Sequence, residues 1–433
     1  MSNTNPARGM RDFLPDQIRK RNYVIGVIKE VYEKYGFEPL ETPSIENLST
    51  LTNKYGEEGD QLMYKILKRG EKLKKQLRRE DEVKEDDLAD LALRYDLTVP
   101  LARVIANNRN ELPRFFKRYQ IQPVWRADRP ARGRYREFYQ CDVDAIGSKS
   151  IVVEVELISA VSEILNRLQF SDFEIRVNHR ESLRKMVSEA GIGEEQTSDA
   201  LVSLDKLDKI GAEGVYKELS ARGIDQTAAS AFLDSVNQES IPKELAELTR
   251  MIPQIKIDLS LARGLSYYTG AIFEMVLTKG DFAGSIAGGG RYDGLIGMFG
   301  KEEIPAVGLS LGLERILMIM EERDMFPDDL TTNAADVLVT IWNEETASDS
   351  LKLAGELRQN GLRVTIYPQP DKLGKQFKYA DQIDVPFVCV LGESEIAENT
   401  VTLKNMKTGD QETLSVKEAI ERLSDHFVTT DSK

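Results

Sequence analysis

The segment from residue 114 to 144, RFFKRYQIQPVWRADRPARGRYREFYQCDVD, constrains the fold more than any other part of the chain. Phe115–Trp125 and Tyr135–Val143 are rich in aromatic and β-branched residues, which is typical of strands. Proline and glycine between them favour a turn, so we predict an antiparallel hairpin. A solvated basic surface would explain any one arginine of its loop. It explains less well the four arginines that this loop holds between two aromatic segments, because the guanidinium fork suits phosphate or carboxylate.

Composition limits the function more loosely. A chain of 433 residues is long enough for two or three domains, and 41% hydrophobic with 30% charged residues is typical of a globular protein. No apolar stretch is long enough to span a bilayer, and the first residues do not form a signal peptide, so we predict a cytoplasmic protein with no membrane partner. Two cysteines and two histidines, all far apart, predict no metal site built by the protein. The net charge of −14 argues against nonspecific nucleic-acid binding but permits local basic patches.

Four segments precede the hairpin. Residues 16–35 carry apolar side chains at helical spacing, and residues 37–46 predict a strand whose Pro43 favours an edge or an interface. The mixed charges of residues 65–90 predict a solvated hairpin to which we assign no chemistry. A strand at Leu91–Tyr95 and a helix starting near Pro100 would place Asp96 and Thr98 in the turn between them. There these two residues either cap the helix or face a pocket.

Beyond the hairpin, residues from about 174 to 255 predict a mostly helical insertion. Residues 257–276 predict two strands meeting near Arg263. The tyrosine pair of this segment, Tyr267 and Tyr268, is equally well explained as part of the hydrophobic core. Residues 283–300 are rich in glycine without matching a dinucleotide or Walker motif, so a tight turn between strands explains most of these glycines. A strand and then a helix starting near Leu311 place Arg315 in the first helical turns, where phosphate is favoured.

The last part of the chain has a different pattern. A polar linker, residues 324–335, is followed by alternating strands and helices up to His426, which predicts a parallel or mixed sheet covered by helices. Lys372, Lys375 and Lys378 give this acidic segment one basic patch.

Several of these segments together resemble class II aminoacyl-tRNA synthetases. Arg126-Ala127-Asp128, followed by Arg134 and Phe138, resembles motif 2 of that class. The helix and the Pro43 segment resemble motif 1, which forms the homodimer interface in the class. Residues 312–315, GLER, resemble motif 3. The motifs occur in the expected order.

Other motifs resemble the histidyl-tRNA synthetase family in particular. Residues 263–269, RGLSYYT, resemble its "RGLDYYT" motif with Ser266 in place of Asp, and other class II enzymes lack this motif. Residues 288–293, GGGRYD, resemble its second motif, in which glycine lets the backbone approach the substrate closely. Residues 96–98, DLT, resemble its "LRPE-x-T" element, with an acid shorter than Glu.

The resemblance implies an α+β catalytic core, an antiparallel sheet with helices, over residues 1–325 with the insertion at about 174–255. It also implies an α/β anticodon-binding domain over residues 334–433. Its partners are histidine, ATP, tRNA(His) and a second subunit. The enzyme would form histidyl-adenylate with Mg²⁺ present and transfer histidine to the 3′ end of the tRNA, releasing AMP and pyrophosphate.

The resemblance also implies roles for individual residues. The histidine-binding residues are Asp96, Thr98, Gln140, Asp144, Tyr267 and Tyr268. The ATP-binding residues are Arg126, Arg134, Phe138 and Arg315. Arg263 and Arg126 are catalytic, with Arg263 acting at the α-phosphate, where related enzymes use a metal.

Two alternatives stay open. One is a non-enzymatic synthetase paralogue that regulates ATP phosphoribosyltransferase; such paralogues typically lose the arginine motif and the C-terminal domain. The other is a different class II synthetase, such as the prolyl or glycyl enzyme, which the motif at residues 263–269 argues against.

Overall fold

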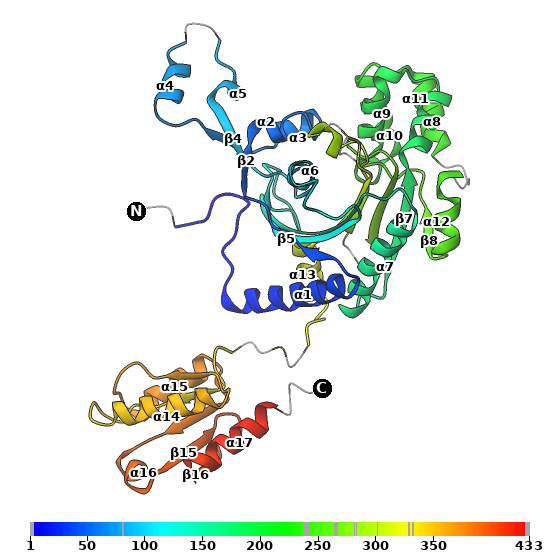
Figure 1. The fold of residues 1–433 in the computed structure, drawn as a ribbon. Helices are drawn as coiled ribbons and strands as arrows, with labels where there is room; N and C mark the ends of the chain where they lie inside the picture. Colours follow the sequence, from blue (N-terminus) through cyan, green and yellow to red (C-terminus); the bar gives the residue numbers. More distant parts are fainter. Residues whose placement is uncertain are drawn as a thin grey trace. The chain divides into compact units, whose positions relative to one another are not determined.

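The computed structural model describes residues 4–79, 82–236, 243–263, 267–280, 282, 284–300, 302–327, 330 and 333–428 (Figure 1). The chain divides into two compact units. The first comprises the residues up to Phe13 together with Lys20–Met325, and the second comprises Leu14–Arg19 and the residues from Phe326 onward. No helix in the described ranges is long and apolar enough to cross a membrane.

A curved sheet of eight strands forms the centre of the first unit. In sheet order its strands are β1 (Glu38–Pro39), β5 (Phe116–Trp125), β6 (Glu137–Ile146), β11 (Ala306–Gly312), β10 (Ser285–Arg291), β9 (Ala271–Leu277), β7 (Phe173–His179) and β8 (Ile255–Ile257). The six strands from β5 to β7 pair antiparallel, and β1 and β8 add parallel edges. The predicted hairpin is confirmed as β5 and β6, and the predicted antiparallel core is confirmed with them.

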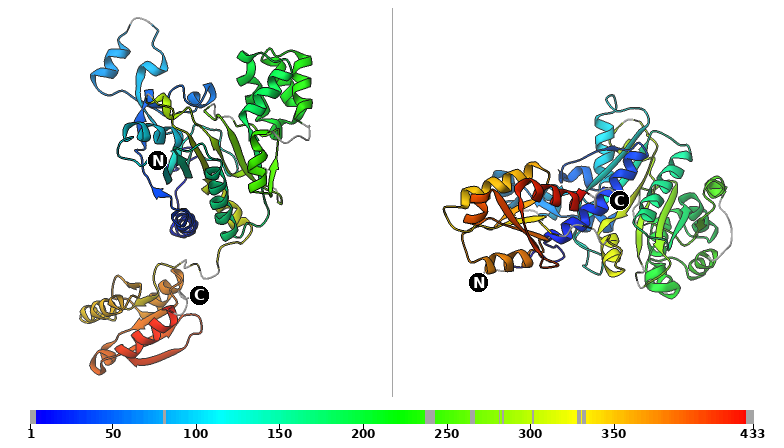
Figure 2. Two further views of the ribbon diagram at one scale, coloured as in Figure 1. Left: turned by 45° about the vertical axis from the view of Figure 1, so that its right-hand side comes forward. Right: turned by 90° about the horizontal axis from the view of Figure 1, so that it is seen from below.

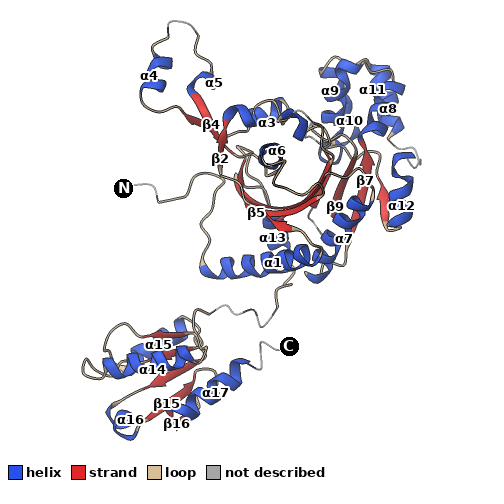
Figure 3. Ribbon diagram, viewed as in Figure 1, coloured by secondary structure: helices blue, strands red, loops and turns tan. Residues whose placement is uncertain are grey.

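Helices cover this sheet. α1 (Pro15–Lys34), α7 (Val152–Arg167) and α13 (Leu313–Glu322) lie on its outer face, and α6 (Thr98–Asn107) begins on its inner side (Figure 3). The amphipathic pattern of α1 buries Val24, Ile28, Val31 and Tyr32, as the spacing predicted. The Tyr32 hydroxyl donates to the Cys141 carbonyl of β6 at 3.2 Å, so a hydrogen bond adds to the apolar contact.

The glycines at 288–290 correct one prediction. They do not form a turn but lie in β10, in the middle of the sheet. A Cβ atom on Gly289 would lie 2.0 Å from the Gly308 carbonyl oxygen of β11, and one on Gly288 would lie 2.4 Å from Arg263 Nη1. Glycine is therefore required here by close approach of neighbouring atoms and not by a turn.

Helices follow β7, so the helical segment begins at Arg180 and not at about residue 174. Its helices are α8 (Arg180–Glu189), α9 (Thr197–Leu204), α10 (Leu207–Ala221), α11 (Gln226–Ser235) and α12 (Ala246–Met251), with 3-10 turns η1 (Glu194–Gln196) and η2 (Lys243–Leu245). Figure 2 shows α8 to α11 gathered into one bundle. Their packed residues, among them Leu183, Leu201, Leu219 and Phe232, continue the core of the catalytic unit.

The prediction of two strands meeting near Arg263 is wrong. β8 ends at Ile257, β9 begins at Ala271, and both pair with β7, which lies between them. The apolar alternation that suggested a longer strand belongs to a loop, whose Leu259 and Leu261 carbonyls accept hydrogen bonds from the Asn178 amide. Gly264, Leu265 and Ser266 of the predicted motif lie outside the described residues.

The segment around Pro43 also differs from its prediction. It forms two short strands, β1 and β2 (Ile45–Asn47), with Pro43 between them. Arg94 donates to the Thr42 carbonyl at 2.5 Å, and Gln120 donates to the Thr42 hydroxyl at 2.9 Å. Side chains, and not a neighbouring strand, therefore supply these hydrogen bonds. The position of β1 at the sheet edge fits the prediction made from the proline.

The segment with mixed charges, residues 65–90, extends from a small three-stranded sheet of order β2-β4-β3. Its elements are β3 (Lys65–Leu67), α4 (Glu71–Leu77), α5 (Glu85–Leu88) and β4 (Ala89–Leu93), and the short helices α2 (Leu48–Leu51), α3 (Glu57–Gln61) and η3 (Ile296–Met298) lie elsewhere in the unit. No residue of α4 or α5 is buried, and ion pairs such as Lys65–Asp86 at 2.6 Å join its two sides. This matches a solvated hairpin.

The second unit has a five-stranded mixed sheet, as predicted. In sheet order its strands are β13 (Val364–Ile366), β12 (Val337–Val339), β14 (Phe387–Val390), β15 (Thr400–Asn405) and β16 (Gln411–Ser415), and its helices are α14 (Ala347–Gln359), α15 (Leu373–Gln382), α16 (Glu393–Glu398) and α17 (Val416–Val428). The first three strands pair parallel and the others antiparallel. The sequence did not predict β16 or α16.

Candidate active site

A cavity of about 520 Å³ opens on the inner side of the curved sheet. Strands β6, β9, β10 and β11 supply its floor, and the first residues of α6 and α13 supply part of its wall. Every side chain predicted for the site lines this one cavity: Asp96, Thr98, Arg126, Arg134, Phe138, Gln140, Asp144, Arg263, Tyr267, Tyr268 and Arg315. Residues from distant parts of the sequence are thus brought together by the sheet.

Asp96 lies where β4 leads into α6 and is only 1% exposed. Its Oδ1 accepts from the Tyr55 hydroxyl at 2.9 Å and from the Val99 amide at 3.0 Å, and its Oδ2 accepts from the Tyr267 hydroxyl at 3.2 Å. Burial raises the pKa of this carboxyl, and the hydrogen bonds oppose the rise. Asp96 is not the N-cap of α6, which is Leu97, but its carboxylate accepts from an amide of the first helical turn and also faces the cavity.

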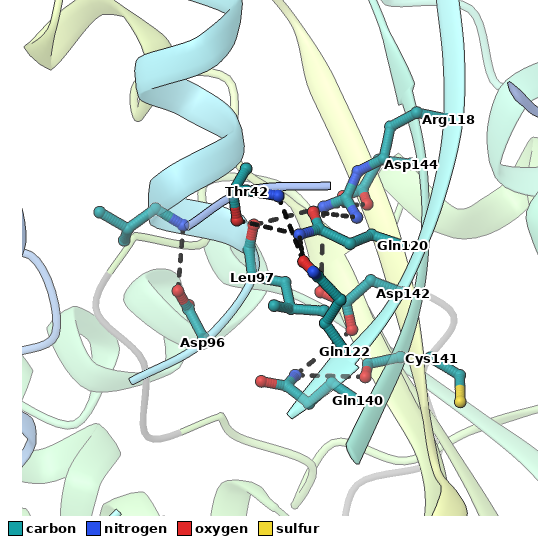
Figure 4. Close-up of polar contacts among 12 residues, drawn as sticks. Thr42, Asp96, Leu97, Arg118, Gln120, Gln122, Gln140, Cys141, Asp142 and Asp144 are labelled. Carbon is teal, nitrogen blue, oxygen red and sulfur yellow. Dashed lines mark hydrogen bonds and ion pairs between the residues drawn. The ribbon is translucent and has the colours of Figure 1, made fainter. Parts of the chain in front are cut away.

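A second acidic group lies on β6. Asp142 and Asp144 point to the same face of the strand, since side chains alternate along it, and both line the cavity (Figure 4). The Tyr292 hydroxyl donates to Asp144 Oδ1. The Gln140 amide donates to Asp142 Oδ1 at 3.3 Å and to Ser310 Oγ at 3.2 Å, while its Oε1 is buried without a partner among the described residues. Burial raises the pKa of Asp142 to about 7.

The other half of the cavity is basic. Arg126 donates Nε to the Tyr95 carbonyl at 3.0 Å, and its guanidinium lies 5.2 Å from the Phe138 ring centroid. Arg315 donates to the Ser285 carbonyl at 2.5 Å. Burial lowers the pKa of Arg315, as do the nearby charges of Arg134, Arg263 and Arg126. These three guanidinium groups, with that of Arg263 next to them, favour a ligand with several negative charges.

Arg263 lies between the two halves. Its Nη1 lies 3.4 Å from Glu274 Oε1 of β9, and its side chain is 22% exposed. The absence of a Cβ on Gly288 makes room for its guanidinium. It is therefore a cation fixed at the junction of the acidic and the basic halves.

Glu314, the third residue of GLER, is a site carboxylate that the sequence did not assign. It is 6% exposed, and its two oxygens accept from the Tyr139 amide at 3.0 and 3.2 Å. This bond ties the start of α13 to β6. Burial raises the pKa of Glu314 to about 7.

We expect a Glu314→Gln variant to gain thermal stability relative to the wild type as the pH rises from 5 to 8. The carboxyl titrates near pH 7 when folded but near 4.3 when unfolded, so the wild type's free energy of unfolding falls by up to about 1.4 kcal/mol per pH unit between those values. The Gln amide keeps an acceptor for Tyr139. Melting temperatures of both proteins across this range measure the effect, and a constant difference would contradict it.

Three further residues of the site were missed: Arg118, Asp142 and Tyr292. Asp142 and Tyr292 stand inside motifs that the sequence singled out, and alternation along β6 would have placed Asp142 beside Asp144. Arg118 is buried below the cavity. The sequence pointed to it only by placing a charged residue in a segment that otherwise looks like a strand.

The fold and the site define the class of protein: an antiparallel sheet whose inner face holds arginines from motifs 2 and 3 is the catalytic core of a class II aminoacyl-tRNA synthetase. A family model described as histidyl-tRNA synthetase matches residues 9–316, and one described as anticodon binding domain matches residues 336–426. The chain belongs to the histidyl-tRNA synthetase family.

Individual relatives agree with this. The chain is 41% identical to a protein of Christiangramia forsetii named histidine–tRNA ligase, over 94% of this chain and 96% of the relative. It is 43% identical to one of Porphyromonas gingivalis with the same name, over 94% and 96%. The crystal structure of histidyl-tRNA synthetase from Nostoc superposes with a TM-score of 0.75 at 30% identity, covering 99% of this chain and all (100%) of that one.

Proposed function

We propose that the chain is a histidine–tRNA ligase (EC 6.1.1.21) that activates histidine with ATP in the cavity described above and transfers it to the 3′ end of tRNA(His). One observation carries the proposal. A single cavity joins an acidic, tyrosine-rich half to a basic half with three arginines, with Arg263 between the two, in a chain of the histidyl-tRNA synthetase family. The first half suits a cationic amino acid and the second suits a triphosphate.

The acidic half would bind histidine. Asp96, Thr98 and Gln140 would hold the α-ammonium group, and the buried Oε1 of Gln140 is an acceptor still to be satisfied. Asp144 and Tyr268 would bond the two imidazole nitrogens, with Tyr267 closing the pocket. Apolar amino acids would leave these buried groups unpaired, which rejects them by about 10⁴–10⁵-fold in favourable cases.

The basic half would bind ATP. Phe138 would stack on adenine, Arg134 and Arg315 would hold the outer phosphates, and Arg126 and Arg263 would hold the α-phosphate and the histidine carboxylate. The carboxylate oxygen then attacks the α-phosphorus in line, pyrophosphate leaves, and histidyl-adenylate forms. Positioning and neutralisation of charge carry such a reaction, so it needs no protein nucleophile.

Mg²⁺ is expected to accompany ATP. No three carboxylate, histidine or cysteine side chains cluster as ligands within the described residues, so the chain offers no prepared metal site there. A magnesium ion of this kind is usually held by phosphates and one or two carboxylates, and it would add positive charge to the phosphates. We assign it no ligand in the protein.

The remaining partners stay predictions. The α/β unit would bind the anticodon, although Lys375 of its basic patch already pairs with Asp371 at 2.8 Å, which weakens the patch. Motif 1 would form a homodimer, and the cytoplasm is the predicted compartment. The regulatory paralogue is less well supported, because the arginine motif reaches the cavity and the anticodon-binding domain is present.

Transfer of labelled histidine to tRNA tests the whole proposal. Purified protein with ATP, Mg²⁺ and tRNA(His) should make acid-precipitable histidyl-tRNA. Well-folded protein that binds histidine and ATP but never charges tRNA would instead support the regulatory alternative.

A further inference from the structure

Arg118 lies beneath the proposed histidine pocket without lining it. Its side chain, on β5, is completely buried at 0% exposure. Its Nη2 lies 2.9 Å from Asp144 Oδ2 and 3.9 Å from Asp142 Oδ2, and its Nη1 donates to Gln120 Oε1 at 3.1 Å (Figure 4). One guanidinium thus reaches both carboxylates of β6 from behind.

Strand pairing fixes this arrangement. Arg118 stands directly opposite Asp144 in the β5–β6 ladder, and Gln120 stands opposite Asp142. Arg118 Nη2 also lies 3.4 Å from the Leu97 carbonyl, next to Asp96. The Arg118 guanidinium therefore contacts the pocket wall at three places, which are Asp142, Asp144 and the Leu97 carbonyl.

The charges explain why a cation is needed there. Asp96, Asp142 and Asp144 are three buried carboxylates around one pocket, and Asp142 and Asp144 are neighbours on one face of β6. Two buried carboxylates this close cannot both stay ionised without a compensating charge. Burial raises the pKa of Asp144, and among the groups that oppose this rise Arg118 acts most strongly.

We propose that Arg118 is a positioning residue that keeps the Asp144 carboxylate ionised and fixes its direction, and so sets the affinity for histidine. This inference rests on the proposed function. Arg118 holds Oδ2 and Tyr292 holds Oδ1, which leaves a lone pair on each oxygen for a substrate N–H. Gly308 keeps the space for this geometry, because a Cβ there would lie 2.0 Å from Asp144 Oδ1.

The test compares Arg118→Gln and Arg118→Lys with a matched control, Arg94→Gln. Arg94 is also 0% exposed and bonded to carbonyls, those of Thr42 and Pro123, but it contacts neither β6 carboxylate. In ATP–pyrophosphate exchange, Arg118→Gln should raise the KM for histidine about 100-fold, because one member of a buried charge pair loses its partner. The KM for ATP should stay within about twofold of the wild-type value. Such a change is small, because about 1.4 kcal/mol of binding free energy corresponds to a tenfold change.

Arg118→Lys keeps the charge but loses the fork, so its KM for histidine should fall between those of the wild type and Arg118→Gln. The control should lose stability without a selective change for histidine. An unchanged KM for histidine in folded Arg118→Gln, an equal rise in Arg94→Gln, or a parallel rise in the KM for ATP would overturn the inference.

A second measurement covers the case in which Arg118→Gln does not fold. The melting temperature of Arg118→Lys is then measured with each substrate. Histidine should raise it much less than it raises that of the wild type, while ATP should raise both equally. Equal protection by histidine would overturn the inference. A wild-type protein without histidine-dependent exchange would overturn the proposed function. Normal exchange by the wild type and by the Arg118 variants would overturn only the inference about Arg118.

Discussion

An Arg263→Ala enzyme is expected to lose about 10²–10³-fold of its histidine-dependent ATP–pyrophosphate exchange rate at saturating substrates. Arg263 is a fixed cation between the acidic and the basic halves of the cavity, where negative charge would build up on the α-phosphate as the carboxylate attacks. The loss should therefore fall on kcat, since the other arginines would still bind the outer phosphates in the proposed complex. Steady-state exchange with separate titrations of ATP and histidine measures it.

Arg323→Ala is the matched control. Arg323 is 29% exposed and pairs with Asp172 at 2.9 Å, much as Arg263 pairs with Glu274, but it does not line the cavity. This variant should lose a little stability and keep its exchange rate. Near-normal kcat in Arg263→Ala, or an equal loss in Arg323→Ala, would remove Arg263 from the reaction.

The second large effect is expected at Asp144. Replacing it with alanine should raise the KM for histidine about 100-fold, because the proposed buried acceptor for an imidazole N–H would disappear and Arg118 would lose the carboxylate that it pairs with. The KM for ATP should hardly change, since Asp144 lies in the acidic half. Exchange assays at varied histidine and saturating ATP give the value.

Asp172→Ala supplies the comparison for this substitution. Asp172 is a mostly buried carboxylate, 10% exposed, that pairs with Arg323 outside the cavity. Its loss should lower the melting temperature and leave the KM for histidine unaltered. The same KM for histidine in Asp144→Ala and in the wild type would show that the pocket lies elsewhere.

Much of the site could be predicted because its residues stand in contiguous motifs. The hairpin, the Asp96 turn and the start of α13 each follow from local apolar spacing, proline and capping, and those rules act over a few residues. The roles came from resemblance, because no local rule says that Asp96 and Arg315 share a cavity.

Other features depend on how strands pair, which local patterns do not contain. Arg118 meets Asp144 only through the register of β5 and β6. The glycines of β10 suggested a turn because close approach by β11 is invisible in one sequence. The strand expected after Ile257 failed because β8 and β9 both pair with β7, and residues 258–263 form a loop after β8.

The measurement that tests the account most directly is ATP–pyrophosphate exchange with each of the standard amino acids in turn. We predict exchange with histidine alone, because only its side chain would pair with the buried Asp144 and Tyr268 groups in the proposed pocket. Exchange driven by another amino acid, or none from folded protein with any of them, would contradict the account.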